Sequence, residues 1–291
     1  MSRYRVTHRT EYVYAESVPL CHNAVHLQPR DTQRQKAYDA QIAITPQPAV
    51  RTDRRDFFGN FVTHFAIQEP HRRLAILSTS EVDVEPTVIP TQVKALLWDD
   101  LARQMIRPTT PDLIDASQFI YDSPQVARDP LLAGYAKPGF PSKKPLVEAV
   151  GDLMLRIHDE FTFDTTATTI GTPVLDVLKH RHGVCQDFAH LMIGCLRSMG
   201  LPARYVSGYL LTSPAPGKPR LVGTDASHAW VSVYFPDHGW IEFDPTNGLI
   251  VSDQHVTLAT ARDYDDVCPV KGVIIGGRNH RLHVSVDVEP L

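Results

Sequence analysis

The stretch RHGVCQDFAHLMIGCLRSMG, from Arg181 to Gly200, decides the fold of this chain. A glycine turn leads into Cys185, where an apolar helix is predicted to begin. Gly200 ends that helix, because glycine favours the left-handed cap and the proline that follows cannot continue it. Apolar side chains recur at helical spacing and form one face: Phe188, Leu191, Met192, Cys195, Leu196 and Met199. Cys185 shares this face, so we expect its thiol to point into the protein or into a cleft.

A cysteine in the first turn of a helix is well placed for nucleophilic chemistry. The unpaired N–H groups there carry partial positive charge, which favours the thiolate. The same groups can hydrogen-bond the oxyanion that forms when a carbonyl is attacked. Taken alone, however, Cys185 is better explained as a small buried apolar side chain. Partners elsewhere in the chain have to decide between the two interpretations.

The composition excludes several classes of protein. The 291 residues, 43% hydrophobic and 21% charged, are typical of a globular protein with one large domain or two moderate ones. A net charge of −4 gives no case for nucleic acid or an anionic membrane as a partner. No apolar run approaches the about 20 residues that span a bilayer. The polar, alternating N-terminus is not a signal peptide, so we expect a cytoplasmic protein.

The 4 cysteines are too few and too scattered for a disulfide framework. Cys195 lies inside the apolar helix face and is expected to be structural. Cys21 and Cys268 have no base motif nearby and are expected to be inert.

Residues 1–90 have the pattern of an antiparallel β region. Side chains of β-forming type fall at alternate positions of the first strand: Tyr4, Val6, His8, Thr10, Tyr12 and Tyr14. Further strands are predicted over residues 24–27, 38–45, 61–67 and 74–84, with turns such as DFFGN between them. This spacing favours a small sandwich. The histidines of this region show no metal-ligand spacing.

Two further regions follow. Residues 91–144 form a helical and irregular connector, and its stretch DSPQVARDPLLAGYAKPGFPSKKP is dense enough in proline and glycine to mark a domain boundary. Residues 145–291 form the second domain, with helices predicted over 146–161 and after Pro173, and a strand over 203–211. A proline-rich loop, SPAPGKP, comes after that strand.

The segment DASHAWVSVYFPDHGWIEFDPTNG predicts a β-hairpin that supplies partners for the thiol. His228 lies on its first strand, PDHG forms the turn, and the return strand delivers Asp244. Because the two strands run antiparallel, His228 and Asp244 can be neighbours. Packed over the start of the Cys185 helix, this hairpin completes a Cys–His–Asp arrangement. His228 would take the thiol proton, and Asp244 would orient and stabilise the imidazolium.

With these residues in order, the chain resembles the transglutaminase-like superfamily, and more closely its bacterial members regarded as cysteine proteases. The resemblance is carried by GVCQDFAHLMIGCLRSMGLPARYVSGYL around Cys185, SHAWVSVY around His228 and GWIEFDPTN around Asp244. It continues in RDYDDVCPVKGV, and the DFFGN region resembles the family's N-terminal β region. The resemblance therefore covers nearly the full chain. Ala261 departs from the pattern, because a glycine is usual there.

The resemblance implies an α+β fold, in which an N-terminal antiparallel β-sandwich-like region precedes a papain-like core. In that core the helix bearing Cys185 packs on an antiparallel sheet bearing His228 and Asp244. The three residues would be nucleophile, base and orienter. Three further residues are candidates for lining the substrate cleft: Trp230, Gln186 and Tyr209.

No metal or other cofactor is expected. A zinc site is one interpretation of the spacing of four residues: His180, His182, Cys185 and His190. It is not favoured, because His190 lies on the other side of the helix from Cys185. No acidic loop resembles an EF-hand, so a calcium requirement is not expected.

The predicted reaction is acyl transfer from a peptide or protein amide through a Cys185 thioester. Water as the acceptor makes the protein a peptidase or amidase, and an amine makes it a transglutaminase or amide ligase. We favour hydrolysis, because water needs no dedicated site. A competing hypothesis is a peptide-binding module that keeps the fold without catalysis. The second donor to the oxyanion and the oligomeric state stay open.

Overall fold

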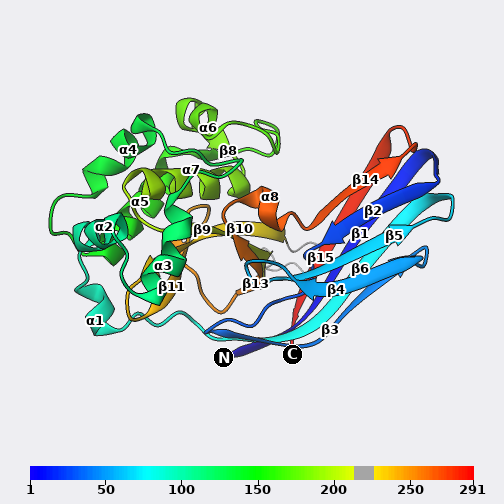
Figure 1. Ribbon diagram of the computed structural model, residues 1–291, viewed down its shortest axis with the longest axis horizontal. Coiled ribbons are helices and arrows are strands. Elements are labelled where there is room, and N and C mark those ends of the chain that lie inside the picture. The colour runs from blue at the N-terminus through cyan, green and yellow to red at the C-terminus, as the bar shows by residue number, and fades with distance from the viewer. Residues whose placement is uncertain (213–225) are drawn as a thin grey trace, which may run out of the picture.

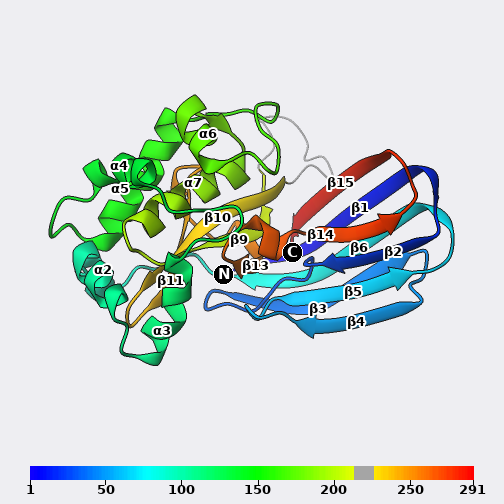
Figure 2. The same cartoon turned by 45° about the horizontal axis from the view of Figure 1, so that its top comes forward.

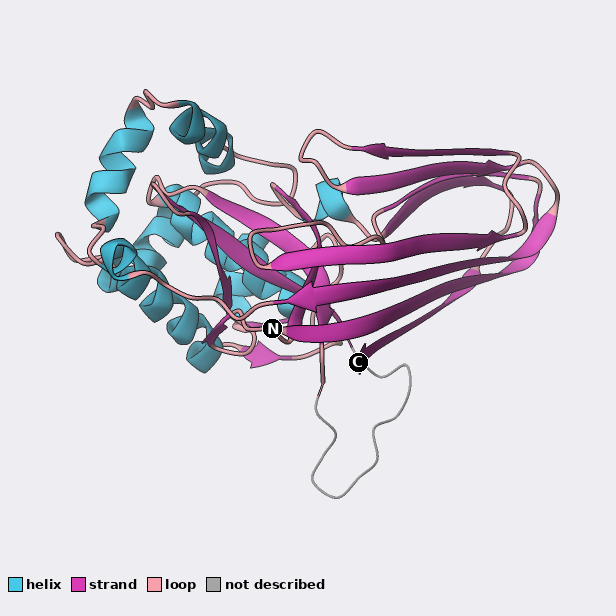
Figure 3. Ribbon diagram, turned by 90° about the horizontal axis from the view of Figure 1, so that it is seen from below, coloured by secondary structure: helices cyan, strands magenta, loops and turns pink. Residues whose placement is uncertain are grey.

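The computed structural model describes residues 1–212 and 226–291, so the predicted loop SPAPGKP lies outside the described residues. Helices gather at one end of the molecule and long strands at the other (Figures 1 and 3). The predicted α+β class is therefore confirmed. Within the described ranges, no helix combines the length and the apolar character that a membrane span requires.

Two four-stranded antiparallel sheets form the β-sandwich. One has the strand order β15-β1-β6-β3 and the other β14-β2-β5-β4. The strands from the N-terminal region are β1 (Ser2–Val18), β2 (Leu20–Val25), β3 (Gln35–Thr45), β4 (Val50–Arg55), β5 (Phe61–Ile67) and β6 (His71–Val84). The sequence pattern misses β4 because all its side chains are exposed, as an edge strand allows, and no alternation marks it.

The alternation predicted for β1 is present, and the buried face of the strand packs against two different parts of the protein along its length. Near the end of β1, Tyr14 belongs to the apolar cluster of the sandwich, together with Cys21 of β2 and Ile67 of β5 from the second sheet. Near its start, Tyr4 and Val6 belong instead to the large apolar core that includes the helices. The same sheet face is therefore covered by the second sheet at one end and by the core that includes the helices at the other.

The C-terminal hairpin, which lies within the predicted domain of residues 145–291, pairs with strands of the sandwich. Strand β14 (Val270–Ile275) pairs with β2, and β15 (His280–Pro290) pairs with β1 over the register Tyr4↔Pro290 to Tyr14↔His280. These strands complete the two sandwich sheets and do not extend the second domain. The chain ends consequently lie side by side (Figures 1 and 2). A strand's own sequence shows that it is a strand but not which sheet it joins.

The second domain is built on a five-stranded antiparallel sheet with the order β12-β11-β10-β9-β13. Its strands are β9 (Ala203–Leu210), β10 (Ala226–Phe235), β11 (Gly239–Asp244), β12 (Leu249–Ile250) and β13 (His255–Ala261). Helix α7 (Cys185–Ser198) packs against β10 and β9 with an almost wholly buried apolar surface. The other helices are α1 (Thr91–Lys94), α2 (Trp98–Ile106), α3 (Pro111–Ser117), α4 (Pro130–Ala136), α5 (Leu146–Glu160), α6 (Val174–His180) and α8 (Tyr264–Val267).

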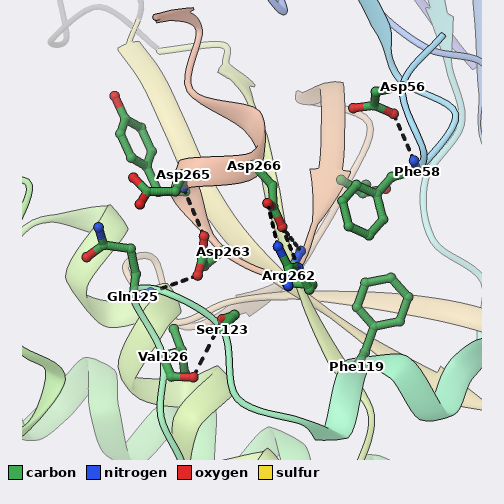
Figure 4. A network of polar contacts seen from close by, with 12 residues as sticks. Asp56, Phe58, Phe119, Ser123, Gln125, Val126, Arg262, Asp263, Asp265 and Asp266 are labelled. Atoms are coloured by element: carbon green, nitrogen blue, oxygen red, sulfur yellow. Dashed lines mark hydrogen bonds and ion pairs between the residues drawn. The ribbon is translucent and has the colours of Figure 1, made fainter.

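Polar contacts tie the connector to this core (Figure 4). The Asp263 carboxylate accepts the backbone N–H of Gln125 at 2.8 Å and that of Asp265 at 2.9 Å. Arg197 of α7 is 1% exposed and donates to groups of four surrounding residues: Phe119, Ser123, Ala203 and Arg262. Because a buried guanidinium is costly unless its donors are satisfied, these bonds fix α7 against the connector.

Candidate active site

Cys185 is the first residue of α7, as the glycine turn before it predicts. The short parallel pair of β7 (Thr162–Phe163) and β8 (His182–Gly183) leads the chain into the helix. The buried Asp187 carboxylate accepts the Val184 N–H at 2.8 Å and the Thr168 hydroxyl at 2.6 Å. A Cβ on Gly183 would lie 2.8 Å from Asp187, so only glycine fits there. Asp187 therefore holds the turn that presents the thiol.

His228 and Asp244 are brought together by the predicted hairpin of β10 and β11. Their Nε2 and Oδ2 atoms lie 2.7 Å apart, and both side chains are buried. The Cys185 thiol lines one cleft with this ring and contributes to the shift in the pKa of His228. Since Nε2 faces Asp244, the Nδ1 atom is the one left for the thiol. Burial opposes protonation of His228, but the hydrogen bonds to Asp244 and Cys185 outweigh it and raise the pKa of His228 to about 10.

The Asp244 carboxylate is surrounded by donors. Its Oδ1 accepts the backbone N–H groups of Thr246 and Asn247 at 2.9 and 3.2 Å. Its Oδ2 also contacts the Asn247 amide nitrogen at 2.6 Å and the His255 Nε2 at 3.1 Å. Burial acts to raise the pKa of Asp244, but the bonds from His228 and His255 lead the effects that lower it. Asp244 therefore stays a carboxylate and can stabilise an imidazolium at His228.

Asn247 and His255 were not predicted from the sequence. Asn247 follows Asp244 in DPTN, so its position in the turn was the only available signal. The amide nitrogen of Asn247 also lies 3.2 Å from His228 Nε2, but both atoms are donors when the ring is protonated, so the bond to Asp244 is the stabilising one. His255 comes from β13, whose place beside β9 only the folded sheet decides.

A cleft of about 370 Å³ opens beside the thiol. Cys185 and His228 line it, together with Gln186 and other residues of the core. The opposite wall comes from the sandwich, through β1 and β15, and consists of His8, Thr10, Tyr12, Leu282 and Val284. The β1 residues of this wall lie between the part of β1 that packs against the second sheet and the part that packs against the core. The cleft is thus a product of how the two regions meet.

Two of the cleft candidates do not border this space. Trp230 is fully buried, and its ring lies so close to Gly208 that a Cβ on that glycine would come within 2.3 Å of it. Tyr209 is 1% exposed, and its hydroxyl lies 2.8 Å from His8 Nδ1. Both side chains are enclosed by neighbouring residues, although each shares its strand face with a residue that lines the cleft. The third candidate, Gln186, does line the cleft.

Metal-ligand residues gather at one place in the described ranges, where atoms of His228, Asp244 and His255 lie within 4.8 Å of one another. These atoms already hydrogen-bond directly at 2.7 and 3.1 Å, and we interpret the cluster as a hydrogen-bonded network around Asp244. His190, one of the residues with zinc-like spacing, is buried and accepts the Tyr264 backbone N–H at 3.1 Å.

Two relatives match almost the whole chain, and a third matches part of it. An uncharacterized protein of Mycobacterium tuberculosis (strain ATCC 25618 / H37Rv) is 43% identical over 295 residues, which cover 99% of this chain and 93% of the relative. An uncharacterized protein of Mycobacterium leprae (strain TN) is 32% identical over 295 residues and all of both chains. A protein-glutamine gamma-glutamyltransferase of Pseudomonas aeruginosa is 36% identical over 93 residues, 31% of this chain and 14% of that protein.

A solved structure from Cytophaga hutchinsonii, described as a "putative cysteine protease", has the same fold. It superposes with a TM-score of 0.76 at 20% identity and covers 100% of this chain and 91% of that one. Residues 4–83 match the bacterial transglutaminase-like N-terminal region, and residues 135–245 match the transglutaminase-like superfamily. This chain belongs to the transglutaminase-like superfamily and carries the bacterial N-terminal region of that family.

Proposed function

We propose that the protein catalyses thiol-dependent acyl transfer from peptide or protein amides, with Cys185 as nucleophile, His228 as general base and Asp244 as orienter. One observation carries the proposal: His228 lies 2.7 Å from the Asp244 carboxylate and lines one cleft together with the Cys185 thiol. That arrangement is the one that nucleophilic acyl transfer requires.

The steps follow from the charges in the site. The raised pKa of His228 favours the imidazolium, and an imidazolium favours the thiolate beside it. The Cys185 sulfur bonds to the amide carbon while the carbonyl π electrons move to oxygen. The tetrahedral intermediate then collapses, the C–N bond breaks, and the departing amine takes a proton from His228. A thioester remains on Cys185.

We propose water as the acceptor that resolves this thioester, which makes the protein a cysteine peptidase or amidase. An amine acceptor is the second candidate, and the similarity to a protein-glutamine gamma-glutamyltransferase over 93 residues favours it. A peptide-binding module without catalysis is the third, and its cleft would bind peptide in the same place.

The test offers the protein a peptide library together with a labelled primary amine and follows the products by mass spectrometry. Cleaved peptides would support hydrolysis, and labelled peptides would support amine transfer. Cys185→Ala should abolish either product. Cys268→Ala is the matched control, because Cys268 is also a partly buried free thiol. Equal activity in Cys185→Ala and wild type would exclude Cys185 as the nucleophile.

Iodoacetamide separates catalysis from mere binding. A thiol paired with His228 should alkylate below pH 8 and faster than the other cysteines, as peptide mapping would show. Equal labelling of the 4 cysteines would favour the binding module.

A further inference from the structure

The phenol of Tyr205 is a polar group in the cleft that the chemistry above does not use. Tyr205 lies on β9, is 2% exposed, and lines the cleft together with Cys185 and His228. Its ring contacts those of His190, at 5.1 Å between ring centroids, and Tyr264, at 6.3 Å. These two contacts restrict the orientation of the ring and of its hydroxyl.

No residue in the described ranges forms a hydrogen bond with the Tyr205 hydroxyl. A nearly buried hydroxyl normally has a partner, since leaving it unpaired costs free energy. A hydroxyl that faces a substrate cleft can find that partner in the substrate. The absence of an internal acceptor therefore leaves the Tyr205 proton available for a bound group.

The phenol and the reacting sulfur line the same cleft. Burial raises the pKa of Tyr205 well above its usual range, and the Cys185 charge leads the neighbouring charges that raise it further. Tyr205 consequently keeps its proton and can only donate to an anion. Tyr264 lines the same cleft, but its hydroxyl accepts the Cys268 thiol at 3.3 Å, and the charge of Cys268 is the foremost one acting on it.

Other side chains are less suited to the role. The Gln186 amide donates to the Ile170 carbonyl at 3.1 Å. The Trp230 Nε1 atom is buried away from the cleft. Ser207 lines the cleft two positions along β9 from Tyr205, on the same strand face. Its hydroxyl extends much less far from the strand than a phenol does.

We propose that the Tyr205 hydroxyl is a catalytic donor that stabilises the oxyanion together with the Cys185 backbone N–H. This inference rests on the proposed function. When the Cys185 sulfur bonds to the carbonyl carbon, the π electron pair moves to oxygen, and the Tyr205 O–H donates a hydrogen bond to it. No proton is transferred. The bond weakens when the carbonyl reforms and His228 protonates the leaving group, so it acts mainly in the transition state.

The experiment compares Tyr205→Phe with wild type, using p-nitrophenyl acetate as the acyl donor and iodoacetamide as the alkylating agent. Acylation of Cys185 passes through an oxyanion, whereas alkylation by iodoacetamide does not. Tyr205→Phe should slow the burst of p-nitrophenolate about 100-fold, as loss of one oxyanion donor does elsewhere. The rate and pH profile of Cys185 alkylation should stay unchanged.

Two comparison variants complete the design. Tyr234→Phe removes a hydroxyl from a buried tyrosine of the neighbouring strand that is outside the cleft, and it should keep the full burst. Ser207→Ala tests the competing donor and should have the smaller effect. Thermal unfolding of all three variants should resemble that of wild type.

The outcomes separate the two proposals. A normal burst in Tyr205→Phe, or an equal loss of acylation and alkylation, would overturn the role of Tyr205 and leave Cys185 as the nucleophile. A wild-type protein that neither gives a burst nor alkylates selectively at Cys185 would overturn the proposed function itself.

Discussion

The two ends of the buried β1 face have the same strand pattern but pack against different parts of the protein. At the sandwich end, Tyr14 meets the second sheet in a small apolar cluster. At the core end, Tyr4 and Val6 meet the core that carries α7. Between them, His8 and Thr10 border the cleft. The comparison teaches that polar side chains on the buried face of a regular strand mark the place where its packing changes from one partner to the other.

The largest expected effect separates the buried carboxylate Asp244 of the core from the half-buried carboxylate Asp56 of the sandwich region. Asp244→Asn should lower the acylation rate about 10⁴-fold, because an amide cannot stabilise the His228 imidazolium. Asp56→Asn is the control, since the Asp56 carboxylate also accepts several bonds, from Phe58 and Asn60, but lies outside the cleft.

The p-nitrophenyl acetate burst and thermal unfolding check this pair of variants. Asp56→Asn should lose some stability and keep its burst. A full burst in Asp244→Asn, or an equal loss in both variants, would contradict the functional difference between the two regions.

Truncating an apolar side chain at either end of this face should lower stability, but only truncation at the core end should also weaken acylation. Leu74→Ala, at the sandwich end, should lower the free energy of unfolding by about 2–5 kcal/mol and leave the acylation burst intact. Val6→Ala, at the core end, should cost about 2 kcal/mol and also weaken the burst, because the cleft wall on β1 loosens.

Urea unfolding and burst amplitudes measure both variants. If Leu74→Ala impaired acylation as much as Val6→Ala does, the proposed difference between the two ends of the β1 face would be wrong.

The smallest expected effect is a loss of stability in acid, caused by one buried neutral histidine in each region. Burial lowers the pKa of His8 to about 4 and that of His190 to about 3. The unfolded chain, with histidine near pKa 6.5, therefore binds more protons than the folded one as the pH falls below that value. The stability from these residues is present above about pH 6.5. It is lost on acidification towards the folded pKa values, at up to about 1.4 kcal/mol per pH unit for each histidine.

Urea unfolding at pH 7 and pH 5 tests this sign. His190→Gln keeps an acceptor for the Tyr264 N–H but has no titrating group, so its stability should fall less steeply with acid than that of wild type. An unchanged slope would show that His190 does not supply the effect.

Much of the site follows from local sequence patterns. The apolar spacing after Cys185 specifies α7, and the alternation on either side of PDHG specifies the hairpin that joins His228 to Asp244. These are contacts over short stretches, where periodicity and turn chemistry determine geometry. The alternation of β1 was predicted for the same reason.

Only the tertiary structure decided what those elements face. Strand patterns could not show that β14 and β15 return to the sandwich, because any compatible sheet edge can pair with a strand. The contribution of His255 to Asp244 and the exposure of Tyr205 to the cleft likewise depend on which strands become neighbours. The sequence by itself determined the residues around the thiol and its hairpin, since these follow from local spacing. The cleft walls depend on contacts between distant segments, so the packing of the two regions decided them.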